Sequence, residues 1–251
     1  MSIWTGLYAL LGTVIGSFLN VCIDRLPEDK SIVFPPSHCP HCQRQLQPLE
    51  LIPIFSYLAL QGRCRTCEGK IPLRVLGVEL GTGILFGLIW QRVGLGVEGI
   101  MTSLYSTLLI LMGTIDLEHQ RVLNKISYPA IALALIAIPI FHADNPWKWV
   151  VGGLVGFGTL FLISLISPQA MGMGDIKLTF FIGLILGYPE IILSLFLAFV
   201  IGGSIAGLLL LLDKIGSKDP IAFGPFLALG GIITLLYGGS ILTWWLRRIG
   251  L

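Results

Sequence analysis

The stretch "GMGDIKLTFFIGLILG" (172–187) decides the fold class, because it places two charged side chains at the mouth of an apolar run. Such a run is typical of a helix in a membrane, where an ionised group costs about 2.5–3.5 kcal/mol at the helix centre. The whole chain agrees: 55% of its 251 residues are hydrophobic and 12% are charged, whereas soluble domains carry about 25% charged residues. Asp175 and Lys177 are therefore expected at a membrane boundary.

Apolar runs of nearly bilayer length predict an all-α polytopic membrane protein with about eight transmembrane helices. The runs cover residues 3–23, 75–93, 97–115, 126–141, 147–167, 176–188, 190–212 and 222–246. Only Tyr188 and Pro189 separate the short sixth run from the seventh, so seven crossings is the alternative. The first run has no basic residue before it and no small-residue cleavage site after it, which favours an uncleaved helix.

Residues 24–74 interrupt this pattern, because they are polar, proline-rich and contain four of the five cysteines. The sequence therefore predicts a first transmembrane helix at 1–23, a small extramembrane domain at 24–74 and the main membrane domain at 75–251. The insertion and the loops on its side carry twelve Lys and Arg, Lys218 among them, against four on the opposite face. This excess places the insertion in the cytosol. The net charge of +2 gives no indication of a nucleic-acid partner.

Two C-x-x-C pairs, "CPHCQRQL" (39–46) and "CRTCEGKI" (64–71), predict a zinc-ribbon-like site. Cys39, Cys42, Cys64 and Cys67 would bind one structural zinc ion, since four thiolates leave no open position for a water. Two disulfides are the alternative, which a reducing cytosol disfavours. His38 and His41 flank the first pair and are expected at the surface rather than as ligands. Cys22 is expected to be an ordinary buried thiol.

Two aspartates are expected at the same membrane face. "GTIDLEHQRVLN" (113–124) places Asp116 where the third span leaves the membrane, and the sixth span enters beside Asp175 from that side. Two carboxyl groups a few ångströms apart share a proton, so one can take a proton from water while the other polarises a carbonyl. This is the chemistry of an aspartyl protease. Gly172 and Gly174 would leave room for an extended peptide.

Structural roles remain open for these residues. A carboxylate at a helix N-terminus is stabilised by the helix dipole, so Asp175 is also a candidate helix cap. Lys177 either reaches lipid phosphates or tunes Asp175, and Glu118 and His119 are expected on a loop surface. The "GPF" stretch (224–226) opens the last span, where proline needs no special function, or forms a wall of the substrate groove.

The chain resembles the type IV prepilin peptidases, which are bifunctional leader peptidases and N-methyltransferases and share a G-x-G-D signature with presenilin-like intramembrane aspartyl proteases. The resemblance spans essentially the whole chain and rests on an ordered set of motifs. These are "GSFLNVCIDRLP" (16–27), the two cysteine pairs around "IPIFSYLALQGRC" (52–64), "IDLEHQ" (115–120), "GMGDIKL" (172–178) and "FGPFLALGG" (223–231).

The resemblance implies that the protein cleaves the basic leader from prepilin and pseudopilin precursors at the cytosolic face of the bacterial inner membrane. It also implies methylation of the new N-terminal residue from S-adenosylmethionine. Asp116 and Asp175 are then the catalytic carboxylates of a peptidase domain at 75–251, supported by Gly172, Gly174 and Lys177. The sequence alone does not indicate which residues bind the methyl donor.

The sequence departs from the family pattern at two places. Relatives usually carry Leu-Pro-Asp where this chain has Val122, Leu123 and Asn124, and many read Arg-Tyr-Pro-x-x-Glu where this chain has Arg74, Val75, Leu76 and then Glu79. The second departure makes cleavage without methylation an alternative. From other classes, a proton- or cation-coupled transporter and a membrane scaffold are the rivals. A transporter would place its acidic groups near the midplane.

Overall fold

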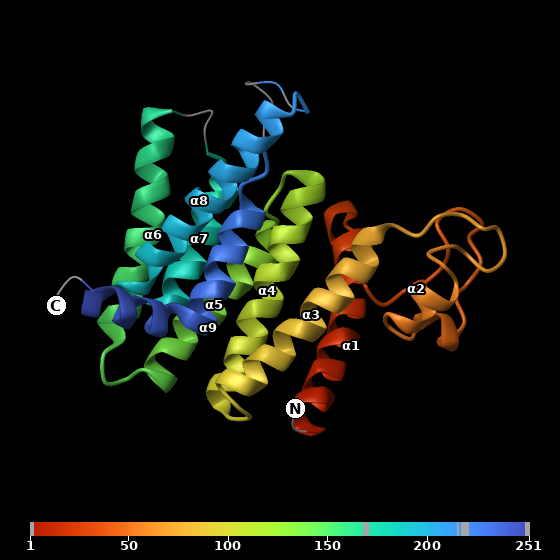
Figure 1. Cartoon of the computed structure of the whole chain (residues 1–251), viewed down its shortest axis with the longest axis horizontal. Coiled ribbons are helices and arrows are strands. Elements are labelled where there is room, and N and C mark those ends of the chain that lie inside the picture. Colours follow the sequence, from red (N-terminus) through yellow and green to blue (C-terminus); the bar gives the residue numbers. More distant parts are fainter. Residues whose placement is uncertain (1–2, 168–170, 215, 217–220, 249–251) are drawn as a thin grey trace. The chain divides into compact units, whose positions relative to one another are not determined.

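The computed structural model describes residues 3–167, 171–214, 216 and 221–248; Lys218 lies outside them. The described helices are α1 (Ile3–Arg25), η1 (Leu26–Glu28), η2 (Pro48–Leu51), α2 (Phe55–Ala59), α3 (Leu73–Arg92), α4 (Val97–His119), α5 (Asn124–Phe141), α6 (Pro146–Ile166), α7 (Met173–Leu186), α8 (Glu190–Leu211) and α9 (Gly224–Arg248) (Figure 1). Within these residues the β-structure is limited to two isolated bridges in the cysteine-rich insertion. The all-α prediction is confirmed.

Seven of the described helices are long and apolar enough to cross a membrane, and α7 is not one of them. With 14 residues it is about 21 Å long, less than the hydrocarbon core of about 30 Å. Even so, α7 returns the chain to the end where α6 begins, since the Tyr188 N–H donates to the Lys148 carbonyl at 3.0 Å. Among the described residues, seven helices are therefore of full spanning length, as the alternative of seven crossings had it, and the short sixth run is the short helix α7.

The chain divides into two compact units, Met1–Thr107 and Leu108–Leu251. In the first unit α1 packs along α3, with the cysteine-rich insertion between them in sequence. Stacked indoles of Trp4 and Trp90, with centroids 6.2 Å apart, lie at the other end of this helix pair. Such aromatic groups are typical of a membrane–water boundary. The division of the sequence at 23 and 74 remains a prediction.

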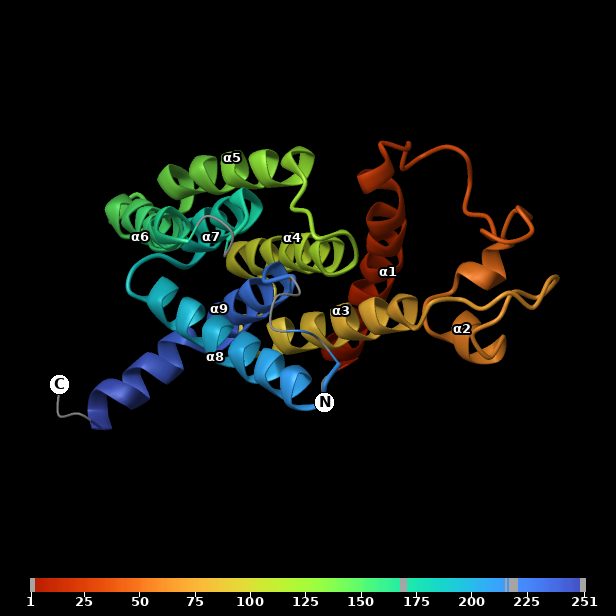
Figure 2. The same cartoon turned by 90° about the horizontal axis from the view of Figure 1, so that it is seen from above.

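In the second unit α7 is the central helix, because it packs against α5, α6, α8 and α9 (Figure 2). Its apolar residues are distributed around the whole helix, and buried side chains such as Ile176, Phe181 and Ile185 point in different directions. A helix that is apolar on all sides is stable when protein surrounds it. This explains why α7 can be shorter than the bilayer: its neighbours, rather than lipid, cover it.

The α6–α7 contact depends on glycine. A Cβ on Gly152 of α6 would lie 2.5 Å from the carbonyl oxygen of Gly183 on α7, and one on Gly156 would lie 2.7 Å from the carbonyl oxygen of Thr179. The two backbones therefore touch directly, as they do where small residues line the contact between membrane helices.

We predict that Gly152→Ala lowers the free energy of unfolding by about 1–3 kcal/mol, because the added methyl group forces the two backbones apart. Gly158→Ala is the matched control on the same helix, since its Cβ would meet nothing within 4 Å. Thermal unfolding of both proteins in the same detergent measures the difference. Equal midpoints for Gly152→Ala and Gly158→Ala would show that the helix contact is not as tight as described.

Candidate functional site

Asp116 lies in the last turn of α4 and is almost fully buried, with 5% of its surface exposed. Its Oδ2 accepts the N–H of Gly224, the first residue of α9, at 2.9 Å. A buried carboxylate requires such a donor, and the first N–H groups of a helix have no partner within the helix. The helix continues three residues beyond Asp116, whereas the sequence predicted that the span ended before it. Glu118 and His119 are exposed as expected, but on this last turn rather than on a loop.

Asp175 lies in the first turn of α7, two residues after the helix begins, rather than before the helix as predicted. Its Oδ2 accepts the N–H of Gly172, the residue that caps this helix, at 3.3 Å. Asp175 therefore does stabilise the helix start, as a carboxylate three residues beyond a cap commonly does. Because the contact uses Oδ2 alone, this capping role leaves the other carboxylate oxygen available.

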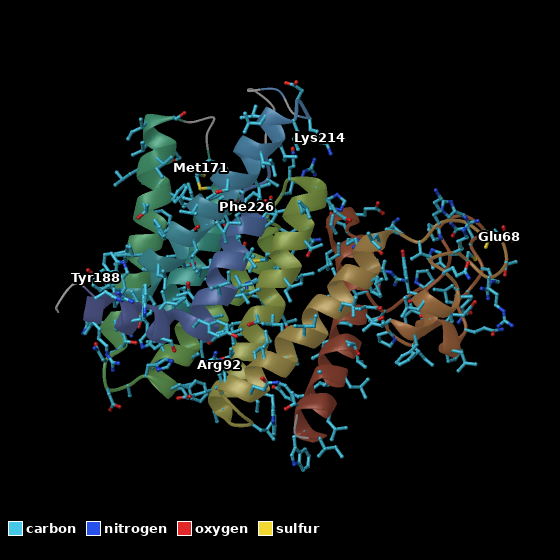
Figure 3. All side chains as sticks on the ribbon, in the orientation of Figure 1. Glu68, Arg92, Met171, Tyr188, Lys214 and Phe226 are labelled. Carbon is cyan, nitrogen blue, oxygen red and sulfur yellow. The ribbon has the colours of Figure 1, made fainter. Side chains whose placement is uncertain are left out.

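The register of α6 against α7 places Asp175 below the end of α6. Gly183 meets Gly152 and Thr179 meets Gly156, so one further turn brings Asp175 level with Leu160. Leu160 lies six residues before the end of α6, a rise of about 9 Å. Figure 3 shows Met171, which precedes the helix, toward one end of the unit and Tyr188, which follows it, toward the other. The short α7 thus sets Asp175 inside the layer that α6 spans.

Asp116 and Asp175 line one cavity of about 420 Å³, a size that suits a bound peptide or small ligand. The remaining wall comes from the segment that follows α4 and from the start of α7: Gln120, Arg121, Val122, Leu123, Asn124, Gly172, Met173 and Gly174. The structure therefore brings together two carboxyl groups that are 59 positions apart in the sequence.

Gly172, Gly174 and Lys177, which were expected to support the two aspartates, make three different kinds of contact. Gly172 caps α7 with ordinary extended backbone angles, so it does not use the conformational freedom of glycine. At Gly174 a Cβ would lie 2.8 Å from the Cβ of Val122, so the close neighbour is the chain's own wall segment. Lys177 donates to Asn124 Oδ1 at 2.8 Å and lies 4.8 Å from the centre of the Tyr128 ring. It therefore ties α7 to the start of α5 rather than contacting Asp175.

The sequence did not predict that segment 120–124 forms a wall of the site: Val122, Leu123 and Asn124 were noted only as a departure from the family pattern. Gln120 turns the chain back with a φ of 51°, a left-handed conformation that residues other than glycine seldom adopt. That turn folds Val122 and Asn124 over the cavity. The "GPF" stretch, predicted as an ordinary helix start or as a wall of the substrate groove, is not among the residues that line the cavity; it contributes the Gly224 N–H that Asp116 accepts.

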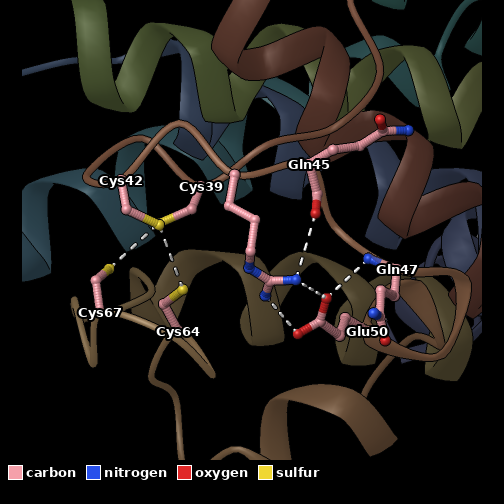
Figure 4. Close-up of polar contacts among 8 residues, drawn as sticks. Cys39, Cys42, Gln45, Gln47, Glu50, Cys64 and Cys67 are labelled. Atoms are coloured by element: carbon pink, nitrogen blue, oxygen red, sulfur yellow. Dashed lines mark hydrogen bonds and ion pairs between the residues drawn. The ribbon is translucent and has the colours of Figure 1, made fainter.

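The cysteine module, which we define as residues 24–72, forms a second site in the first unit. All five cysteines are free, and the Sγ atoms of Cys39, Cys42, Cys64 and Cys67 lie within 4.8 Å of one another (Figure 4). The Cys39–Cys67 and Cys42–Cys64 sulfur pairs are 3.7 and 4.0 Å apart. A tetrahedral ion with metal–sulfur bonds of about 2.3 Å requires sulfur atoms roughly 3.8 Å apart. The four sulfurs therefore fit a metal ion.

The two C-x-x-C loops have the same backbone fold. The Cys39 N–H donates to the Arg44 carbonyl and the Cys64 N–H to the Gly69 carbonyl, each at 2.9 Å. Gln43 and Glu68 occupy the same left-handed position, with φ of 58° and 56°. Backbone N–H groups of the second loop donate to the Cys64 sulfur and lower the pKa of that thiol to about 6. Such loops prepare thiolates for a metal.

A bidentate ion pair supports this module. Both guanidinium NH₂ groups of Arg44 donate to the Glu50 carboxylate, at 2.7 and 3.1 Å (Figure 4). The Gln47 N–H donates to the same carboxylate. These contacts, the Arg44 bond first, hold the pKa of Glu50 below its usual value. His38 and His41 are not part of the four-sulfur group, and His41 packs over Gly69.

The second departure from the family pattern lies where the module meets α3. Arg74 pairs with Asp24 at 2.5 Å, and the Val75 carbonyl accepts the Asn20 side-chain N–H at 3.0 Å. Glu79 is buried and accepts the Ile54 N–H at 2.7 Å. Of the two charged residues that the pattern shares with this chain, Arg74 therefore joins α3 to the last turn of α1, and Glu79 holds the module to α3.

Comparisons with known proteins give two family matches that together cover most of the chain. Residues 10–93 match the bacterial peptidase A24 N-terminal domain, and residues 103–207 match the type IV leader peptidase family. No solved structure matches the chain at a comparable level.

Several curated proteins, each named prepilin leader peptidase/N-methyltransferase, are similar over nearly their whole length. The Bacillus subtilis protein is 32% identical over 241 residues, covering 95% of this chain and 96% of its own. The Stutzerimonas stutzeri protein is 34% identical, and the match covers 92% of this chain and 90% of that protein. The Pseudomonas aeruginosa protein is 33% identical, and the match covers 96% of this chain and 93% of that protein. With identities and coverage of this order, the chain is a multi-pass membrane protein that belongs to the type IV leader peptidase family.

Proposed function

We propose that this protein is an aspartic endopeptidase that removes the leader from prepilin and pseudopilin precursors and then N-methylates the new N-terminal residue. The observation that carries the peptidase proposal is the cavity that Asp116 and Asp175 share. The names of the relatives, prepilin leader peptidase/N-methyltransferase, support both activities.

The two carboxyl groups would act as a pair. Two like charges that face one cavity disfavour double ionisation, so one group would keep a proton while the other is ionised. The ionised group takes a proton from water, and the neutral group donates a hydrogen bond to the carbonyl oxygen of the scissile amide. The proton then passes to the leaving nitrogen. The pair titrates as a unit, so neither role belongs to one residue alone.

The position of the site suits a precursor with a basic leader and an apolar helix. Asp175 lies about 9 Å below the end of α6 by the helix register. If the apolar helix of the precursor lies beside the second unit, its polar end therefore reaches the cavity. The scissile amide then does not have to enter the centre of the bilayer. The excess of basic residues supports an orientation in which the cysteine module and the cavity face the cytosol from the bacterial inner membrane.

Methyl transfer would follow cleavage, with S-adenosylmethionine supplying the methyl group. The departure at Val75 and Leu76 leaves Arg74 and Glu79 in ordered contacts, which supports a retained activity. We assign no residue of this chain to methyl-donor binding.

We propose zinc as the ion of the cysteine module, held by Cys39, Cys42, Cys64 and Cys67 in a structural role. The supporting observations are the sulfur spacing and the pair of matching loops. A module whose described residues form only short helices and two isolated bridges gains much of its folding energy from such an ion.

The transporter and the scaffold are less well supported. Both carboxylates belong to a cavity near one end of the second unit, whereas coupled transporters place such groups near the midplane of the membrane. A scaffold has no need for a buried carboxylate such as Asp116. The carboxylate accepts the Gly224 N–H, and this contact is possible only because glycine has no Cβ.

The direct test is purified enzyme with a precursor, with and without methyl donor, read by mass spectrometry. We predict that Asp116→Asn and Asp175→Asn each reduce cleavage by about 10²–10⁴-fold, because each removes half of the proton-transfer pair. Glu118→Gln, two residues from Asp116 and exposed, is the matched control and should cleave normally. With methyl donor, wild-type product should gain the mass of one CH₂. Full cleavage by either aspartate variant would exclude the pair mechanism. Wild-type product that stays unmethylated in the presence of methyl donor would show a peptidase without methyltransferase activity.

We predict that Gly224→Ala reduces cleavage by roughly ten- to a hundredfold, because small displacements of a catalytic group have large effects. A Cβ at this position would lie 2.5 Å from Asp116 Oδ2 and would push the carboxylate away from its donor. Gly239→Ala, on the same helix with nothing within 4 Å, is the control. Cleavage rates per folded enzyme compare the two, and an unchanged rate in Gly224→Ala would remove the role of this contact.

We predict that the purified protein contains one zinc ion per chain and that Cys64→Ser loses it, because a hydroxyl group is a poor zinc ligand. Cys22→Ser is the matched control, since Cys22 is the cysteine outside the four-sulfur group. Elemental analysis by mass spectrometry reports the content. Retention of full zinc content by Cys64→Ser would show that the ion is bound elsewhere.

A further inference from the structure

The short helix α2 in the cysteine module has apolar side chains on its outside. Phe55 and Leu58 are 71% and 60% exposed, and Ala59 is exposed beside them. Residues three apart share one helix face. The polar side of the helix is turned inward, where the Tyr57 hydroxyl donates to the Ile71 carbonyl at 3.3 Å. A helix on a water-facing surface has the opposite arrangement.

The turn before α2 extends this apolar surface. Leu49 is 72% exposed, Leu51 and Ile52 are also exposed, and η2 packs against α2. We call the exposed apolar side chains of η2, of α2 and of Ile52, which follows η2, the η2–α2 surface: Leu49, Leu51, Ile52, Phe55 and Leu58. Exposed apolar groups gathered on adjoining elements mark a contact with a membrane or a partner.

A part-buried hydrogen bond to the buried Glu79 fixes the depth of this surface. The N–H of Ile54, the residue that caps α2, donates to Glu79 Oε2 at 2.7 Å. Glu79 lies six residues into α3, a rise of about 9 Å, whereas the polar layer on each side of a bilayer is roughly 5–8 Å thick. Helix α2 therefore begins beside the second turn of a spanning helix. Figure 1 likewise shows α2 beside the α1–α3 pair rather than beyond the ends of these helices.

We propose that the η2–α2 surface inserts into the lipid of the leaflet in which α3 begins, so that the module is an interfacial domain and not a freely projecting one. Three observations select lipid as the occupant. The module leaves the membrane at α1 and returns to it at α3, the Ile54–Glu79 bond holds α2 at lipid depth, and Leu73, the first residue of α3, is likewise an exposed apolar side chain. Apolar side chains at this depth are the usual anchors of interfacial helices.

Photocrosslinking in full-length protein tests the proposal. A benzophenone analogue of phenylalanine is placed at position 55, at position 58 or at position 70, and each protein is reconstituted into vesicles of phosphatidylethanolamine and phosphatidylglycerol. Position 70 is the control, because Lys70 is exposed and lies two residues from Glu68, which Figure 3 shows at the outer edge of the module. After irradiation, mass spectrometry of the peptides identifies lipid adducts.

We expect lipid adducts at positions 55 and 58 and several times fewer at position 70. Position 58 provides an independent reading if the analogue disturbs the module at position 55, and unchanged thiol reactivity of the four clustered cysteines reports the fold. Equal labelling at all three positions, or no lipid adduct at 55 and 58, would overturn the proposal. Adducts at 55 and 58 to a second copy or to an added precursor, in place of lipid, would make this surface a protein interface and would overturn it as well.

Discussion

The hydrogen bond from the Gly224 N–H to the Asp116 carboxylate is the contact on which the arrangement of the second unit depends. It joins the last turn of α4 to the first residue of α9, and it compensates a carboxylate that is 5% exposed. Without a donor, burial of this group would cost several kcal/mol. The N-terminus of a helix supplies unpaired N–H groups at no further cost. Glycine is required there because a Cβ would lie 2.5 Å from the accepting oxygen.

The second constraint is the length of α7. Its backbone contact with α6 fixes the register through Gly152 and Gly183, and α7 therefore begins about one turn short of the end of α6. This places Asp175 inside the protein layer rather than at its edge. The cavity arises because α7 begins below the level at which α6 ends, and segment 120–124 lines the space that this leaves. Helix packing thereby generates the site, and the G-x-G-D signature marks where it does so.

Much of this arrangement could be predicted from the sequence, and the remainder has identifiable reasons. Apolar runs located the spans to within four residues, and the alternation of crossings placed Asp116 and Asp175 at one face. The spacing of the cysteines predicted four sulfurs in one cluster, which the structure contains. Hydropathy could not decide whether the short sixth run spans the bilayer in contact with lipid or is covered by protein, so both seven and eight crossings stayed open until α7 was seen among its neighbours. The turn at Gln120 and the Gly224 donor depend on contacts distant in sequence, and no local pattern reports them.

The joint action of the two carboxyl groups is tested most directly by the binding of a precursor peptide whose scissile amide is replaced by a secondary alcohol. Its affinity is compared with that of the same peptide carrying a methylene group in place of the alcohol. A paired site should bind the alcohol more tightly, because the hydroxyl group takes the place of the attacking water between the two carboxyl groups. The account predicts that this preference disappears to the same extent in Asp116→Asn, in Asp175→Asn and in the double variant. A preference that persists in either single variant would contradict it.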